Sequence, residues 1–111
     1  MKELDPRNLN DIKKLSSALE TLVYFEILQI ETKDLIADVM SAAHPSAFES
    51  WMKKTGNEDA SSCPVDELLP YAENPDDFVQ RYIKTIHLCL FDERTRAASA
   101  DEIAEVVLND Q

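Results

Sequence analysis

Apolar residues recur at helical spacing through the first thirty positions of the chain. They fall on every third or fourth residue: Leu9, Ile12, Leu15, Leu19, Leu22, Val23, Ile27 and Ile30. This spacing predicts an amphipathic helix that begins at Asp5-Pro6 or at Asn8, where a capping side chain or a proline suits the first turn. Residues 22–30 are apolar on the other side as well, which predicts burial in a core or at a subunit interface. A short β-strand is the competing interpretation of 23–30, and the long helical lead-in favours a helix.

A second apolar stripe follows, and it lies nearly opposite the first at about 100° per residue. It consists of Leu35, Ile36, Val39, Met40 and Ala43. Two arrangements fit this change of face. In the first, the chain breaks near 31–33, with Thr32 capping a new helix. In the second, one helix from about 8 to 43 packs one face along its first part and the opposite face along its last part. The second arrangement suits a dimer, in which half of the helix meets its own core and half meets the partner.

The middle of the chain is divided by helix caps. Ser46 and Glu49 match the capping box, in which the two side chains satisfy two free N–H groups reciprocally. Gly56 stands where that helix needs a left-handed residue at its end. One helical turn is predicted at 64–69, ended by Pro70.

The C-terminal third carries two further start signals. Asn74-Pro75 combines a capping side chain with proline at the first helical position, and it predicts a helix that runs to about residue 91. The main apolar stripe of that helix is Phe78, Val79, Tyr82, Ile83, Ile86, Cys89 and Leu90. Ser99 and Glu102 form a second capping box and predict a short final helix.

These elements predict an all-α fold, a small single-domain bundle of four to five helices spanning 1–111. The N-terminal segment to about Ala43 and the 75–91 helix are expected to form the main packing pair. One glycine in 111 residues argues against β-hairpins and phosphate-binding loops, which depend on glycine for positive φ.

Several apolar residues lie off these stripes and exceed what a small bundle needs. They are Tyr24, Phe25, Leu28, Leu88 and Phe91. Apolar surface left over in this way predicts an interaction site, and we expect these residues to form a homodimer interface or a groove for a partner protein.

The charge is strongly uneven. The formal net charge is −11, and residues 56–111 hold thirteen acidic and four basic side chains, against nine and seven in 1–55. An acidic surface repels nucleic acid and anionic lipid and attracts basic protein surfaces. The expected steering surface is Asp66, Glu67, Glu73, Asp76 and Asp77. The tail from Ser99 resembles the first helix of a helix-turn-helix, but the sequence ends at Gln111 without room for a recognition helix, so direct DNA binding is not expected.

The N-terminus lacks the apolar segment of a signal peptide, and no apolar run approaches the ~20 residues of a membrane span. We therefore expect a cytoplasmic protein that binds no membrane. In that compartment Cys63 and Cys89 are expected to be free thiols.

Candidate chemistry is sparse. His44, Cys63, His87 and Cys89 could in number hold zinc, but His87 and Cys89 are two residues apart on a helix and cannot face one ion. Cys63 with His44 or His87 would make a nucleophile pair, yet nothing supplies an oxyanion loop. We therefore expect no catalytic residue, no metal and no cofactor.

Acidic residues near the first helix give two weaker candidates. Glu26 falls within the apolar stripe and could act as an acid–base or specificity residue, although pairing with Lys or Arg or simple exposure is the favoured explanation. Glu31, Asp34 and Asp38 share a helix face, but without a Glu-x-x-His motif they do not suggest a di-iron site, and a solvated face is expected.

The leading hypothesis is a small acidic regulatory protein that binds another protein stoichiometrically, as an inhibitor, antiactivator or adaptor, and that is not an enzyme. The alternative is a DNA mimic or nuclease-immunity protein that uses the acidic C-terminal half. A metal- or thiol-dependent enzyme is the least favoured reading.

Overall fold

The computed structural model describes residues 6–59, 63–92 and 97–109, and within these ranges the chain is helical and contains no strand. The helices are α1 (Pro6–Tyr24), α2 (Ile30–Ala43), α3 (Pro45–Thr55), α4 (Val65–Leu68), α5 (Pro75–Phe91) and α6 (Ala100–Asn109), with a 3₁₀ turn at Leu69–Tyr71 after α4. The predicted all-α fold is confirmed. The described ranges hold six α-helices rather than four to five. The N-terminal segment forms two of them, and the single turn before Pro70 is a short helix of its own, α4.

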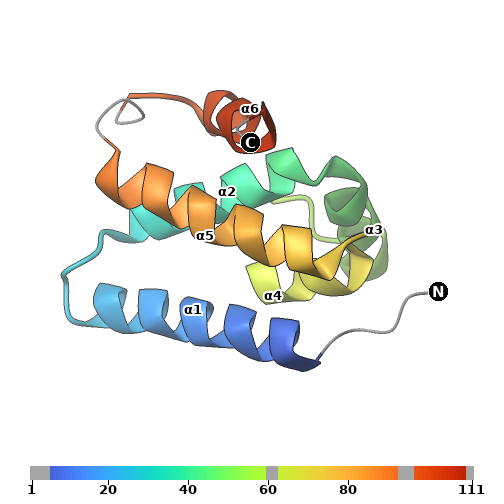
Figure 1. Ribbon diagram of the computed structural model, residues 1–111, viewed down its shortest axis with the longest axis horizontal. Coiled ribbons are helices and arrows are strands. Elements are labelled where there is room, and N and C mark those ends of the chain that lie inside the picture. The colour runs from blue at the N-terminus through green and yellow to red at the C-terminus, as the bar shows by residue number, and fades with distance from the viewer. Residues whose placement is uncertain (1–5, 60–62, 93–96, 110–111) are drawn as a thin grey trace.

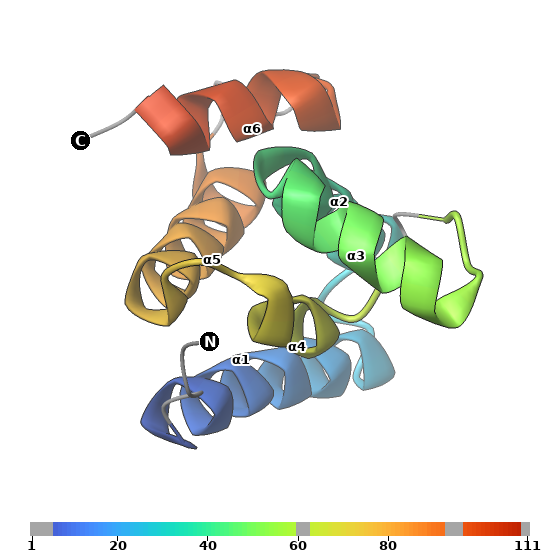
Figure 2. The same cartoon turned by 90° about the vertical axis from the view of Figure 1, so that its right-hand side faces the viewer.

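The helices are arranged around α2. In Figure 1, α1 and α5 run in one direction along the long axis and α2 runs back in the opposite direction behind α5. Figure 2 shows α6 lying across α2 and α5, while α3 and α4 cover one end. Of the described helices, α2 packs on all five others, and its most extensive contact is with α6.

Both sides of α2 are buried, each in a different apolar cluster. Ile36 and Met40 belong to the main core, with buried residues of α1, α3, α4 and α5. Val39 and Ala43 belong to a second cluster. That cluster is completed by Leu88 of α5 and by Ile103, Ala104 and Val107 of α6. The expected packing of the N-terminal segment on the 75–91 helix is present, but the short final helix contributes more to holding α2 than the sequence suggested.

The N-terminal segment forms two helices, so the predicted single helix from about 8 to 43 is wrong, and the break lies earlier than the predicted 31–33. After Tyr24 the chain turns through Glu26, whose φ of 62° is left-handed. The amide of Glu26 donates to Val23 O at 3.0 Å and that of Ile27 donates to Leu22 O at 2.9 Å. This pair of hydrogen bonds is the Schellman arrangement that ends a helix, with glutamate in the position that usually holds glycine. Thr32 lies inside α2 and caps nothing, because Gln29 occupies the N-cap position.

The other cap predictions divide into confirmed and wrong ones. Gly56 has φ 74° and donates to Met52 O, as expected for the end of α3. The Asn74 side chain accepts from the amide of Asp77 at 3.2 Å. The second capping box is present in both directions, Ser99 N to Glu102 Oε1 at 3.1 Å and Glu102 N to Ser99 Oγ at 3.2 Å.

The first capping box is wrong. His44 is the N-cap of α3 and Pro45 is its first residue, so Ser46 already lies inside the helix. Proline is favoured at the first helical position because its missing N–H has no partner there in any case. At α1, which begins at Pro6, the first of the two predicted starts agrees with the structure, while Asn8 lies inside the helix and donates its side-chain amide to Asp76 Oδ1 of α5 at 2.9 Å.

Replacing Glu26 with glycine should stabilise the protein. A left-handed conformation costs an L-residue about 1–2 kcal/mol, which exceeds the extra entropy that glycine gains in the unfolded chain. We expect Glu26→Gly to raise the free energy of unfolding by about 1 kcal/mol and Tm by about 4 °C in a thermal melt. Glu26→Ala is the control, since it removes the carboxylate but keeps the Cβ. Equal stabilisation by both variants would show that charge, not backbone conformation, limits this turn.

Candidate functional site

The exposed apolar residues gather at one end of the molecule. Four lie in the connection from α1 to α2 and one ends α5. The exposed fractions are 80% for Tyr24, 63% for Phe25, 73% for Ile27, 56% for Ile30 and 71% for Phe91. In Figure 1, the end of α1, the start of α2 and the end of α5 meet at the same side of the molecule. We call these five residues the apolar end.

The apolar end includes three of the five residues that the sequence singled out. Tyr24, Phe25 and Phe91 are exposed, whereas Leu28 and Leu88 are 9% and 3% exposed. The expectation of a free surface is wrong for these two leucines. Leu28 packs into the main core directly after the Glu26 turn, and Leu88 is covered by α6 in the second cluster. Ile27 and Ile30 were assigned to the buried stripe and are exposed because the helix stops before them.

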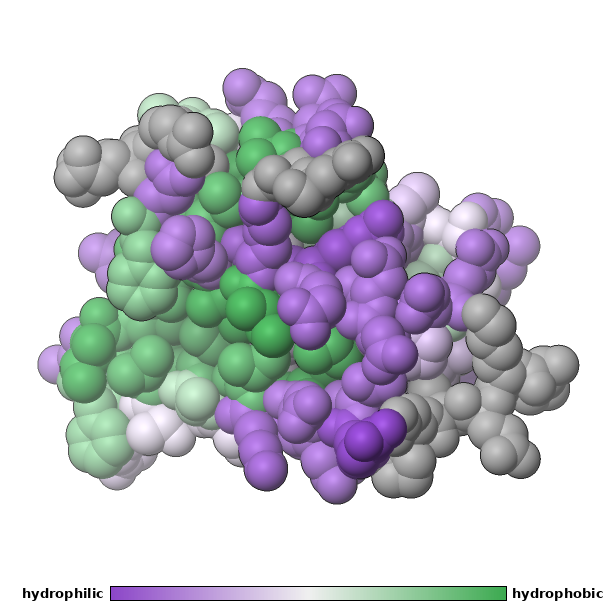
Figure 3. Space-filling view, in the orientation of Figure 1, coloured by the Kyte–Doolittle hydropathy of each residue, from purple (hydrophilic) through white to green (hydrophobic). Residues whose placement is uncertain are grey.

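The apolar surface continues from this end along α5. Ile83 is exposed, and Ile86 and Leu90, on the same face of the helix at i+3 and i+7, are half-buried. Figure 3 shows apolar residues spreading over the end where α1 and α5 finish and along the front of the molecule between these helices. The predicted stripe of α5 is thus rotated, since burial follows Thr85 and Leu88 rather than Ile83.

The predicted acidic steering residues lie toward the opposite end, on α4, the following turn and the start of α5. Figure 3 shows hydrophilic residues dominating that side. Glu67 and Glu73 are exposed, and Asp66 is half-buried. Asp76 accepts the hydrogen bond from Asn8 and so joins α5 to α1, and Asp77 pairs with Arg81 of the same helix at 3.1 Å.

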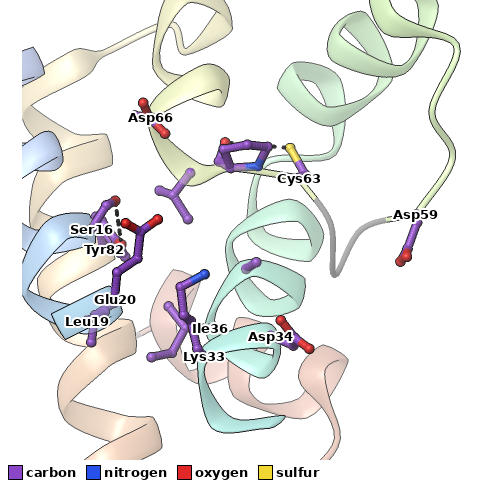
Figure 4. Close-up of a pocket in the computed structure, with 13 residues that line it drawn as sticks. Ser16, Leu19, Glu20, Lys33, Asp34, Ile36, Asp59, Cys63, Asp66 and Tyr82 are labelled. Carbon is purple, nitrogen blue, oxygen red and sulfur yellow. Dashed lines mark hydrogen bonds between the residues drawn. The ribbon is translucent and has the colours of Figure 1, made fainter. Parts of the chain in front are cut away.

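A cavity of about 430 Å³ lies between α1, α2 and α4, and Figure 4 shows its walls. Its inner wall holds a hydrogen bond between Ser16 Oγ and Tyr82 Oη at 3.1 Å. Glu20 and Lys33 extend toward the space between the helices, while Asp59 lies at the outer edge. Apolar residues such as Leu19, Ile36 and Val65 share this lining with the polar ones, and a partly polar cavity of this size has room for ordered water.

A second group of acids was not predicted as a site. Asp34 and Asp38 of α2 are half-buried rather than on the solvated face that the sequence suggested, and Glu31 is exposed. Burial raises the pKa of Asp38, and the nearby carboxylates of Asp59, Asp101 and Asp34 raise it further. These residues come from three separate segments. The i, i+4 spacing of the α2 pair is the part of this group that the sequence displays.

The side chains that could bind a metal or act as nucleophiles are not clustered in the described part of the chain. The described part of the chain contains no group of three or more His, Cys, Asp and Glu side chains that could hold a metal ion. Cys63 and Cys89 are free thiols. Burial, and then the charge of Glu67, raises the pKa of Cys63 to about 12, and burial raises that of Cys89 to about 11. Both thiols therefore stay protonated near neutral pH, which makes them poor nucleophiles.

The remaining candidates, Glu26, His87 and His44, differ in how far they are exposed to solvent. Glu26 is exposed in the turn that ends α1, outside any apolar environment. His87 is exposed, and its ring contacts Phe91 at 5.8 Å between centroids. His44 lies at the junction of α2 and α3, where its ring packs on Phe78 at 4.6 Å.

Searches against protein-family models, curated proteins and solved structures find no significant match to this chain. Among the described residues, no helix is both long enough and apolar enough to cross a bilayer. The function is therefore argued from the surfaces themselves.

The environment of His44 predicts that acid destabilises the fold. Nδ1 lies 2.9 Å from Met40 O and so carries the proton, while Nε2 is buried and no described group hydrogen-bonds to it. Burial lowers the pKa of His44 below its ordinary 6.5, and Arg81 lowers it further, against the raising effects of the Met40 hydrogen bond and Asp77. The unfolded chain therefore takes up the proton first. Stability that is present above pH 6.5 is lost as the pH falls toward the folded-state pKa.

Urea unfolding at pH 7.0 and 5.5 tests this prediction. We expect the unfolding free energy of the wild type to decrease over this interval and the decrease to be smaller in His44→Asn, whose side chain keeps a donor for Met40 O. The exposed His87 provides the control, and His87→Asn should retain the wild-type dependence. An equal decrease in all three proteins would assign the acid effect to other groups.

Proposed function

We propose that the protein is a small acidic regulatory protein that binds another protein stoichiometrically, as an inhibitor, antiactivator or adaptor. The observation that supports this proposal is the apolar end, where five large apolar side chains are each more than half exposed. Apolar patches of this kind on a small domain mark interaction sites. We place the protein in the cytoplasm, in keeping with its two free thiols.

The composition and order of the apolar end suit a contact surface. Aromatic residues are enriched at the energetic centres of interfaces, and Tyr24, Phe25 and Phe91 supply three. The rings of Tyr24 and Phe25 meet edge to face at 5.1 Å, so each restricts the other before any partner arrives. Fully burying one such side chain contributes about 1.5–3 kcal/mol.

The acidic steering residues act at a distance in this proposal. The molecule is 39 Å long, and the apolar end and the acidic side lie toward opposite ends of it. At physiological ionic strength charges are screened beyond about 8 Å. The acids therefore orient an approaching basic partner more than they contribute to the contact at the apolar end, and affinity there should depend little on salt.

The alternative function, a DNA mimic or nuclease-immunity protein, would use the acidic side instead. The run of seven acids without a base from Glu58 to Asp77 supports this alternative. Asp76 and Asp77 weaken it, because their carboxylates already hold Asn8 and Arg81. Mimicry requires affinity that falls steeply with salt and depends on Asp66, Glu67 and Glu73.

A second copy of the chain is a further possible occupant of the apolar end, and it would make the protein a homodimer. Each copy carries a net charge of −11, which opposes self-association. Sedimentation at low and moderate salt separates the two cases, since a dimer held by Phe25 and Phe91 would persist in Leu108→Asp and dissociate in Phe25→Asp.

Partner capture by charged variants tests the proposal. Tagged wild-type protein and the Phe25→Asp and Phe91→Asp variants are incubated with native lysate at 50 and 300 mM salt, and the retained proteins are quantified. We expect one dominant partner to be retained at both salts by the wild type. Each variant should reduce its retention about 10- to 100-fold, the effect of losing an interface hot spot.

The matched control is Leu108→Asp, which places the same charge at an exposed apolar residue of α6. It should capture the partner as the wild type does. Circular dichroism checks that each variant is folded. If Phe25→Asp and Phe91→Asp retain the partner, or if the wild type loses it at 300 mM salt, the apolar end is not the contact.

A further inference from the structure

A groove of about 760 Å³ lies between α2, α3 and the first turn of α6. Figure 2 shows how these elements are arranged, with α6 above α2 and α3 in front of it. Its floor is apolar and includes Ala42, Pro45, Phe48 and Met52. Acidic side chains flank that floor: Asp38 from α2, Glu49 from α3 and Asp101 from α6. The apolar end contributes no residue to this groove, so the two surfaces can be altered separately.

Charge in the groove is unevenly matched. Glu49 has a cationic neighbour, Lys53, at 3.4 Å on the same helix. Asp38 instead faces like charges, since Asp59, Asp101 and Asp34 all raise its pKa in addition to burial. Carboxylates held together in this way repel one another, and a cation among them relieves the repulsion.

The floor suits the stem of a long cationic side chain. The ring of Phe48 lies nearly parallel to that of Trp51, at 5.8 Å between centroids and an angle of 19°, and it contributes flat apolar surface to the groove. Met52 is flexible and adapts to the shape of what binds beside it. Lys and Arg place their methylene stems on apolar surfaces while their charged heads stay among polar groups, and Arg also stacks on aromatic rings.

We propose that this groove binds a basic segment of a partner protein, with an arginine or lysine stem on Phe48 and Met52 and its cationic head facing Asp38 and Asp101. Charge complementarity selects this occupant over a second copy of the chain, whose net charge is −11. The inference deepens the proposed function, on which it rests for the existence of a protein partner, and it gives that partner a basic segment in addition to its apolar contact.

Nuclear magnetic resonance titration with a defined peptide tests the groove without the partner. The probe is acetyl-Leu-Arg-Leu-Arg-amide, and its control contains citrulline in place of arginine, which keeps the shape and removes the charge. With the arginine peptide we expect amide shifts to change in the C-terminal half of α2, in α3 and at 99–101. The single tryptophan, Trp51, gives an independent fluorescence readout because it stacks on Phe48.

Asparagine substitutions test whether the carboxylates of Asp38 and Asp101 bind the cationic side chain of the peptide. Asp38→Asn and Asp101→Asn should each weaken the arginine peptide by about threefold, the scale of a partly exposed ion pair. Removing one of several like charges relieves repulsion, so Asp38→Asn should also fold. Asp11→Asn, at an exposed position of α1, is the matched control and should bind as the wild type does.

Four results would overturn the inference: equal binding of the citrulline peptide, unchanged affinity in Asp38→Asn, shifts that map outside the groove, or shifts that depend on protein concentration without peptide, which would indicate a second copy. Phe25→Asp separates this test from that of the proposed function. The variant should bind the peptide normally. A negative result with the peptide would therefore not count against the apolar end as a contact surface, and loss of partner capture in Phe25→Asp would not count against the groove.

Discussion

The burial of α2 on both sides is the interaction on which the rest of the structure depends. Ile36 and Met40 face the main core, while Val39 and Ala43 face the cluster built with α6. A helix with apolar residues on two sides must be covered on both, and here every other described helix contributes to that cover. Removing α6 would expose Val39 and Ala43, and removing α1 or α4 would open the main core.

This enclosure also determines what remains outside. The chain passes from α1 to α2 through a tight turn at Glu26. Leu28 then packs into the main core, whereas Tyr24, Phe25, Ile27 and Ile30 at the same junction stay exposed. The end of α5 lies at the same side of the molecule and adds Phe91. The helix count, the early turn and the apolar end are thus consequences of one arrangement, in which α2 takes the central position.

The same arrangement separates charge from apolar surface. The acidic residues of α4 and the start of α5 lie toward the far end, and a second acidic group forms where α2, the 56–59 segment and the start of α6 approach one another. The second group borders the groove between α2, α3 and the start of α6. The partner that we propose therefore has both an apolar contact, for the apolar end, and a basic segment, for the groove.

Local signals in the sequence predicted much of the fold, because capping chemistry acts over a few residues. Gly56, Asn74 and the Ser99–Glu102 box end or begin helices as expected. The break at Glu26 could not be predicted in this way, since a non-glycine residue with positive φ is held by the surrounding fold and has no sequence signature. Leu88 was misassigned for a related reason, because its burial depends on α6, which is distant in sequence.

In the candidate site too, features set by local sequence could be predicted and features set by tertiary contacts could not. The aromatic residues of the apolar end were visible as a surplus over what a small bundle needs, so three of the five were found. Ile27 and Ile30 were missed, since helical periodicity continued through a break that the chain makes. The group around Asp38 joins Asp59 and Asp101 from other segments, and only the tertiary structure brings these together.

The most direct test of the account is site-specific photocrosslinking in the native cell. p-Benzoyl-phenylalanine replaces Phe25, which keeps an aromatic ring at the apolar end, and in a parallel protein it replaces the exposed Leu108 of α6. The account predicts one dominant heterologous crosslinked protein from position 25 and none in common from position 108. The same product from both positions, or no product from position 25, would contradict the assignment of the apolar end as the contact surface.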